Sequence, residues 1–382
     1  MKQKIVKWIT PVVFLVLIFG MAVANLLSPT RAVSESENRH LKMMPKFSWK
    51  ALVDGTFTAE FEEFLTDQFI GRDGFIGVKT ESEYLLGKRD TNSVYFGKKG
   101  YLLEKKTSHD LDEQLEKNLG YLEEFTERAA AELGAGHVRV LMAPTASLLE
   151  ADKLPAYAPI YDQQAVLDEL ESRLPEGVYV DAAGVLQAHA GEELYYRTDH
   201  HWTTLGAFYG YQAYKQSLGL PVKQPSDFTT EVVSESFYGT HYSKARLVTT
   251  RPDRIIRWLP KTPQGGFQVD YNGGQKQSDS LYDESFLSKR DKYSYFLGGN
   301  NALVTIRSSN PNGKHLLLVK DSYAHSMVPF FADEYESIHM VDLRYYNGKL
   351  SEYIPQEGIT DVLVLYNTTT FTSDIGVPKM AL

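Results

Sequence analysis

Apolar residues recur at two different spacings along this chain of 382 residues, and the alternation of the two predicts an α/β fold. Apolar side chains at helical spacing predict amphipathic helices at residues 110–133, 165–174 and 203–218. Short apolar runs, typical of strands covered on both faces, occur at residues 138–144, 316–319 and 362–365, with a further short strand at 177–181. Because strands alternate with helices, we expect a mainly parallel sheet flanked by helices.

Two polar stretches depart from this alternation of strands and helices. Residues 28–60 are polar and are interrupted by a proline, as is typical of a tether. Residues 225–300 are rich in Gly, Gln, Ser, Asp and Tyr, and they predict an irregular or β-rich insertion. Such an insertion often shapes a binding site. Between the two stretches, the pattern predicts a helix at residues 58–72 and a hairpin at residues 92–103.

The N-terminal segment, residues 1–27, combines three lysines with an apolar run over residues 8–27. A run of roughly 20 apolar residues is long enough to cross a bilayer as a helix. The lysines should stay in the cytoplasm, which places the remaining chain outside the cell. Ala22-Val23-Ala24 also resembles a signal-peptidase site. The segment is therefore either a retained single-pass membrane anchor or a signal peptide cleaved after Ala24, and both alternatives export the rest of the chain.

Composition excludes several classes of function. The chain has no cysteine, so thiol catalysis, zinc–cysteine sites and disulfides are excluded. Its formal net charge of −9 argues against nucleic acid as a partner, because nucleic-acid binding needs basic patches. A neutral polysaccharide stays possible as a partner. Hydrophobic residues make up 43 % of the chain, which is enough for a packed core.

The densest group of chemically active residues is the run Asp199-His200-His201-Trp202. If this run is extended, successive side chains point to opposite faces, so Asp199 and His201 share a face and His200 points away. A carboxylate and an imidazole on one face are the base half of a hydrolase site. The alternative is structural, with Asp199 as a helix cap and His201 as a buried, hydrogen-bonded histidine. We expect Trp202 to hold the motif in place by packing, or to contact the substrate.

A candidate nucleophile, Ser322, directly follows the apolar run at 316–319. Open α/β sheets place their active sites beyond the carboxyl ends of their strands. His201 can act as the base if the fold brings it within about 3 Å of this serine, and Asp199 would then orient the imidazole. The alternatives are that Ser322 caps a helix, or that Ser326 is the nucleophile.

An acyl transfer also needs donors for an oxyanion. The backbone N–H groups of Ser322 and Tyr323 are the first candidates, and the side chain of Asn367 is another. A metal site is the competing explanation of the histidine cluster, with His189, Asp199, His200 and His201 as ligands. We expect neither a metal nor a cofactor, because adjacent residues of an extended chain do not easily bind one ion together.

The motif at residues 199–202 resembles that of the DHHW protein family, which is similar to the SGNH-hydrolase-like proteins of alginate O-acetylation. Further residues of this chain resemble landmarks of the same family. In chain order they are Glu37-Asn38-Arg39, Asp67, Arg72, residues 94–102, Ala143-Pro144-Thr145 and Leu154-Pro155. The resemblance implies an SGNH-hydrolase-like catalytic domain, here over residues 61–382 with its insertion at about 225–300. It also implies that an Asp-x-His pair precedes the serine in the chain.

The expected function is O-acetyl transfer to, or removal from, an extracellular or cell-wall polysaccharide, with a triad of Ser322, His201 and Asp199. The resemblance implies a membrane-bound O-acyltransferase as the partner that supplies the acyl group. Two alternatives stay open. One is a non-catalytic component that binds polysaccharide or assists its assembly, and the other is D-alanyl transfer to teichoic acid.

Overall fold

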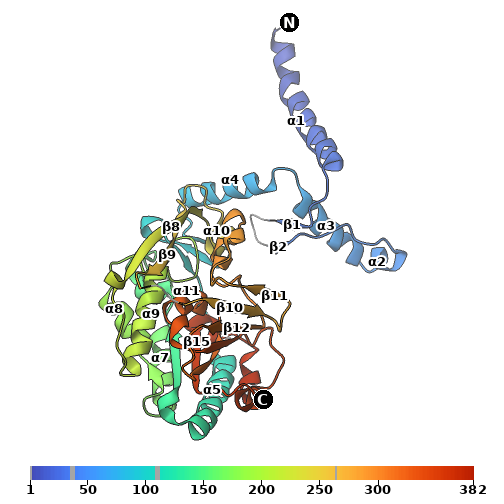
Figure 1. The fold of residues 1–382 in the computed structure, drawn as a ribbon. Coiled ribbons are helices and arrows are strands. Elements are labelled where there is room, and N and C mark those ends of the chain that lie inside the picture. Colours follow the sequence, from blue (N-terminus) through green and yellow to red (C-terminus); the bar gives the residue numbers. More distant parts are fainter. Residues whose placement is uncertain (1, 35–38, 108–111, 263–264) are drawn as a thin grey trace. The chain divides into compact units, whose positions relative to one another are not determined.

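The computed structural model describes residues 2–34, 39–107, 112–262 and 265–382. It divides the chain into two compact units (Figure 1). Unit 1 comprises Met1–Lys88 with Arg246–Thr249, and unit 2 comprises Arg89–Ala245 with Thr250–Leu382. Two of the residues that carried the family resemblance, Glu37 and Asn38, lie outside the described residues.

Unit 1 is built from helices. These are α1 (Lys2–Leu27), α2 (Trp49–Val53), α3 (Thr56–Gln68) and α4 (Arg72–Leu85), with a short pairing of β1 (Val33–Ser34) and β2 (Arg39–His40). In the described part of the chain, α1 is the one helix long and apolar enough to cross a membrane, over Trp8–Leu27. This finding is consistent with a signal sequence or a single anchor.

The helix predicted at residues 58–72 ends earlier than expected. It stops at Gln68, and Gly71 then takes the left-handed conformation with φ of 71°, which a residue without Cβ adopts without strain. Arg72 therefore begins α4 instead of ending α3. The apolar spacing continues across this corner, and for that reason the periodicity alone did not reveal the break.

Asp67, near the end of α3, is the centre of a cluster of charges in unit 1. Its two carboxylate oxygens accept hydrogen bonds from the Arg39 guanidinium, at 3.0 and 2.6 Å, and Oδ2 also accepts the Lys42 N–H at 2.8 Å. Arg72 lies 4.0 Å away. Chiefly through the hydrogen bonds from Arg39, and despite burial, these contacts lower the pKa of Asp67 to about 2.

Unit 2 contains an eight-stranded mixed sheet in the order β11-β10-β12-β14-β13-β15-β6-β7. Its parallel part consists of β14 (Ser337–Val341), β13 (His315–Lys320), β15 (Asp361–Asn367), β6 (Val138–Ala143) and β7 (Tyr179–Val180). The antiparallel part consists of β12 (Leu303–Ser308), β10 (Phe267–Tyr271) and β11 (Lys276–Ser278).

Helices cover both faces of this sheet (Figure 1). One face packs against α8 (Ala182–Ala188), α9 (Thr204–Ser217) and α11 (Ala324–Met327), and the other against α5 (Asp112–Leu133), α7 (Gln163–Arg173) and α12 (Leu350–Gln356). Along β13 the side chains alternate between the two cores, with Leu316 and Leu318 in the first and Leu317 and Val319 in the second. The predicted α/β fold class, a mainly parallel sheet flanked by helices, is therefore confirmed.

The insertion is β-rich, as predicted, but part of it belongs to the main sheet. Its strands β8 (Phe228–Phe237) and β9 (Asp253–Pro260) form a separate antiparallel pair, whereas β10 and β11 extend the central sheet. The predicted hairpin is also present. Strands β4 (Val94–Phe96) and β5 (Leu102–Glu104) pair antiparallel, and β3 (Asp90–Thr91) adds a third strand.

Candidate active site

Ser322 lies just beyond the carboxyl end of β13, in the turn that leads into α11. The neighbouring Asp321 carboxylate fixes this turn, because it accepts the Tyr323 N–H at 2.8 Å and the Asn367 N–H at 2.7 Å. Asn367 ends β15, the strand beside β13, so one buried carboxylate joins the serine turn to the adjacent strand. Ser322 itself is half-buried and is therefore partly open to solvent.

The segment around Asp199 is a tight turn, so the extended backbone assumed from the sequence is wrong. Tyr195 pairs with Trp202 across an antiparallel bridge, and the Tyr196 N–H donates to the His201 carbonyl at 3.2 Å. Because the chain doubles back here, side chains do not alternate between two faces. His200 accordingly does not point away from Asp199: its Nδ1 lies 3.7 Å from Asp199 Oδ2.

Asp199 is held from several sides. It accepts hydrogen bonds from the His201 backbone N–H at 3.1 Å, from the Thr240 N–H at 2.7 Å and from His201 Nδ1. A Cβ at Gly239 would lie 2.2 Å from the Asp199 side chain, so glycine is required for this close approach. Burial opposes ionisation, but the His200 and His201 rings and these hydrogen bonds outweigh it, so the pKa of Asp199 lies well below its ordinary value.

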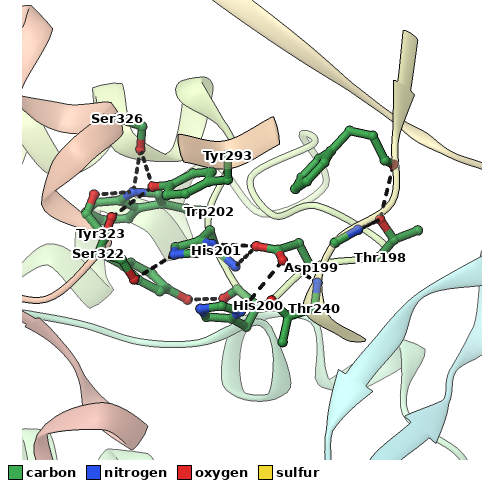
Figure 2. A network of polar contacts seen from close by, with 12 residues as sticks. Thr198, Asp199, His200, His201, Trp202, Thr240, Tyr293, Ser322, Tyr323 and Ser326 are labelled. Atoms are coloured by element: carbon green, nitrogen blue, oxygen red, sulfur yellow. Dashed lines mark hydrogen bonds and ion pairs between the residues drawn. The ribbon is translucent and has the colours of Figure 1, made fainter. Parts of the chain in front are cut away.

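The three predicted residues meet in one chain of contacts (Figure 2). His201 Nε2 lies 2.7 Å from Ser322 Oγ, and His201 Nδ1 is hydrogen-bonded to Asp199 Oδ1. Both Asp199 and His201 are buried. In this arrangement the imidazole can take the serine proton through one nitrogen while the carboxylate stabilises the charge that develops on the ring.

Tyr293, from the turn Lys292–Tyr295 of the insertion, was missed by the sequence analysis. Its ring stacks on the His201 imidazole with 3.6 Å between centroids and 11° between planes. Its hydroxyl donates to the Ser322 carbonyl at 3.1 Å and lies 3.0 Å from Ser326 Oγ (Figure 2). Tyr293 thus contacts both the imidazole and the serine turn. No local sequence pattern distinguishes it among 24 tyrosines.

Trp202 and Ser326 are buried and hydrogen-bonded to each other beside the serine turn. The indole of Trp202 is fully buried, and its Nε1–H donates to the Tyr323 carbonyl and to Ser326 Oγ, each at 3.0 Å. It packs directly on α9, where a Cβ at Gly210 would lie 2.7 Å from the ring. Trp202 therefore packs the motif in place. Ser326 is buried and hydrogen-bonded, which disfavours it as the nucleophile.

The three candidate donors for an oxyanion differ in whether they already have an acceptor. Tyr323 N–H is engaged by Asp321, and the Asn367 side-chain amide donates to Asp321 at 2.6 Å and to Thr370 Oγ1 at 2.7 Å. These bonds occupy both candidates that lie beside the serine. The Ser322 N–H has no acceptor among the residues that the structure describes, so it is the donor available to an oxyanion.

Three of the four residues of the metal hypothesis come together. Ligand atoms of Asp199, His200 and His201 all lie within 4.8 Å of one another, so the argument that adjacent residues cannot converge is wrong. His189 is instead hydrogen-bonded to Glu192 at 2.9 Å and stacked on Tyr209. Both ring nitrogens of His201 already contact Asp199 and Ser322, and a metal on this ring would have to displace one of these contacts.

The sheet and the serine–histidine–aspartate contacts define an α/β protein with a hydrolase-type arrangement at the carboxyl edge of its sheet. The DHHW protein family matches residues 172–341, which include both the motif and Ser322, and the resemblance to this family is thereby confirmed. Among curated proteins, none matches the sequence.

Solved structures support the fold. A DHHW family protein from Eubacterium siraeum is 28 % identical, with a TM-score of 0.63 over 76 % of this chain and 95 % of that chain. PatB1 of Bacillus cereus is 19 % identical, with a TM-score of 0.62 over 73 % of this chain and 97 % of that chain. The O-acetyltransferase domain of Pseudomonas putida AlgJ is 14 % identical, with a TM-score of 0.45 over 74 % of this chain and 93 % of that chain. That last likeness is too distant to support an argument.

Proposed function

We propose that this protein is an extracytoplasmic O-acetyltransferase, or acetylesterase, that acts on an exopolysaccharide or cell-wall polysaccharide through an acyl-serine intermediate. The observation that carries the proposal is the contact of 2.7 Å between Ser322 Oγ and His201 Nε2, with Asp199 on the other ring nitrogen. A buried carboxylate, an imidazole and a half-exposed serine in this order are the parts that nucleophilic acyl transfer requires.

The reaction has two stages. Ser322 Oγ attacks the carbonyl carbon of the acyl donor, and His201 Nε2 takes the hydroxyl proton. The oxyanion accepts a hydrogen bond from the Ser322 N–H, and its collapse expels the leaving group, which takes the proton from His201. In the second stage His201 removes a proton from a sugar hydroxyl or from water, that oxygen attacks the acyl-serine, and Ser322 regains its proton. A sugar acceptor makes the protein a transferase, and water makes it an esterase.

The location of this chemistry is also part of the proposal. Helix α1 would anchor the protein by a single pass with residues 28–382 outside the cell, unless it is cleaved after Ala24. The predicted division into a tether at 28–60 and a catalytic domain at 61–382 stays a prediction. A membrane-bound O-acyltransferase would supply the acyl group on the outer side, where the anchor keeps this domain near its donor.

The contacts in the site favour this function over a non-catalytic component, because a degenerate site would not keep all three side chains within reach of one another. D-alanyl transfer to teichoic acid would use the same serine chemistry. It differs in the acyl group, so an assay with acetyl and D-alanyl donors separates the two.

Turnover of p-nitrophenyl acetate by the full chain, with and without an oligosaccharide acceptor, tests the proposal. We expect Ser322→Ala to abolish release of p-nitrophenol and Ser326→Ala to retain it. Acetylated oligosaccharide as product identifies a transferase, and free acetate alone identifies an esterase. Retention of turnover in Ser322→Ala, with loss in Ser326→Ala, would overturn the assignment of the nucleophile.

A further inference from the structure

The corner between α3 and α4 in unit 1 exposes an apolar surface that the proposed chemistry does not use. Its four large apolar side chains, with the exposed fraction of each, are Leu65 (49 %), Ile70 (41 %), Phe75 (57 %) and Val78 (66 %). Phe75 and Val78 lie three residues apart on α4 and therefore share a face of this helix. Apolar side chains gathered in this way on a surface mark an interaction site.

The surface is hollowed and has an exposed lysine at its edge. A groove of about 460 Å³ is lined by Leu65, Thr66, Phe69, Arg72, Phe75, Ile76 and Lys79. Its walls are mainly hydrocarbon, and the Lys79 ammonium group, on a side chain that is 74 % exposed, lies 3.9 Å from the Glu83 carboxylate. An apolar groove beside an exposed ammonium group matches the chemistry of a phospholipid, which has acyl chains next to a phosphate.

The same corner is hydrogen-bonded to the end of α1. The Ile70 N–H donates to Asn25 Oδ1 at 2.7 Å. Two more bonds join the chain just after α1 to the last residue of α3: the Arg31 N–H donates to Gln68 Oε1 at 2.8 Å, and Gln68 Nε2 donates to the Arg31 carbonyl at 2.9 Å. The apolar span of α1 ends at Leu27, two residues beyond Asn25. A helix of this length that crosses the bilayer has its end at the boundary between lipid and water.

The geometry points to the α3–α4 corner as a surface that rests on the outer leaflet of the bilayer that α1 crosses, with phospholipid as the occupant of its groove. The inference rests on the proposed function only in so far as α1 is retained as an anchor. Phospholipid is favoured over a protein partner because the bonds to Asn25 hold the exposed side chains at the depth where headgroups and upper acyl chains lie. The corner would then remove its apolar side chains from water without any further partner.

Spin labels on the full chain test this inference directly, because the absence of native cysteine allows one label at a chosen position. The chain is placed in vesicles of phosphatidylethanolamine and phosphatidylglycerol, with a label at Phe75→Cys or Val78→Cys. Matched controls are Glu62→Cys, exposed on α3, and Ile375→Cys, an exposed apolar position of unit 2. Collision with oxygen, which partitions into lipid, is compared with collision with a water-soluble nickel chelate.

We expect the ratio of oxygen to nickel collisions to be several-fold higher at residues 75 and 78 than at the two controls. Asn25→Ala should lower it, and Asn25→Asp, which keeps the acceptor oxygen for the Ile70 N–H, should restore it. Equal ratios at all four positions would overturn the inference. A raised ratio at residues 75 and 78 only when a membrane-bound acyltransferase is present would also overturn it, since the occupant would then be protein. A mature chain that begins at Asn25 would overturn it as well.

The two proposals fail separately. The label measurement needs no turnover, so equal ratios leave the Ser322 chemistry untouched. Conversely, a chain without acyl transfer can still show both labels in lipid.

Discussion

Asp67 in unit 1 and Asp199 in unit 2 are both buried carboxylates with a lowered pKa, but their partners differ in kind. Asp67 is paired with Arg39, a cation that does not lose its proton. Asp199 is paired with His201, which can gain and lose a proton, and the far nitrogen of that ring touches Ser322.

The comparison shows that a perturbed carboxylate is not by itself a sign of catalysis. Both residues also resembled landmarks of the same family in the sequence. What separates them is the chemistry of the partner: an arginine keeps its proton, whereas an imidazole can take up a proton and pass it on. Experiments that make the same substitution at Asp67 and at Asp199 test this distinction.

The largest expected effect is on turnover. Asp199→Asn removes the charge that orients and stabilises the His201 ring, so we expect kcat to fall by about 10³- to 10⁴-fold with the fold intact. Asp67→Asn, the matched change, should leave kcat near the wild-type value. Hydrolysis of p-nitrophenyl acetate measures both. Similar losses in the two variants would contradict the distinction drawn here.

The second effect is on stability and concerns Asp67. Because the pKa of Asp67 falls to about 2 on folding, its contribution is present above its unfolded pKa and is lost as pH falls through about 2. We expect Asp67→Asn to lower the free energy of local opening of α3 by about 1–2 kcal/mol at pH 7. Hydrogen exchange of α3, compared with the wild type at the same pH, measures it. A difference that does not shrink as pH falls towards 2 would count against the ion pair.

Substitution of Tyr293 should have a smaller effect on turnover, and it tests the contacts around the His201 imidazole. Tyr293→Phe keeps the ring stacked on His201 and removes the hydroxyl bonds to Ser322 and Ser326, so we expect kcat to fall by about fivefold to tenfold. KM for p-nitrophenyl acetate and the melting temperature should change little, as expected of a positioning residue. Tyr295→Phe, in the same turn but stacked on Tyr282, is the control and should behave as wild type. A fall in melting temperature that accounts for the lost activity would make Tyr293 merely structural.

The smallest effect is expected at His200, which neighbours Asp199 without reaching the serine. His200→Ala should reduce kcat by less than about fivefold, because its imidazole is outside the proton path. Chelators should have no effect. Loss of activity with EDTA and recovery with Zn²⁺ would instead show that Asp199, His200 and His201 form a metal site.

The sequence predicted those parts that local patterns encode. The apolar runs predicted the parallel strands. Because Ser322 directly follows one of these runs, its place at the carboxyl edge of the sheet was also predicted. Asp199 and His201 were paired for the wrong reason, because the turn between Tyr195 and Trp202 is fixed by a bridge that spacing does not reveal. Tyr293 was missed because its contact with His201 joins residues 92 positions apart, and such contacts have no local signature.

Trapping of the acyl-enzyme tests the central claim most directly. The full chain is mixed with p-nitrophenyl acetate, quenched in acid and digested, and the peptides are identified by mass spectrometry. We expect one acetyl group on Ser322 in the wild type and none in Ser322→Ala, with slow formation of the adduct in Asp199→Asn. An acetyl group on Ser326, or turnover by the wild type without any acetylated serine, would contradict the assignment of Ser322 as the nucleophile.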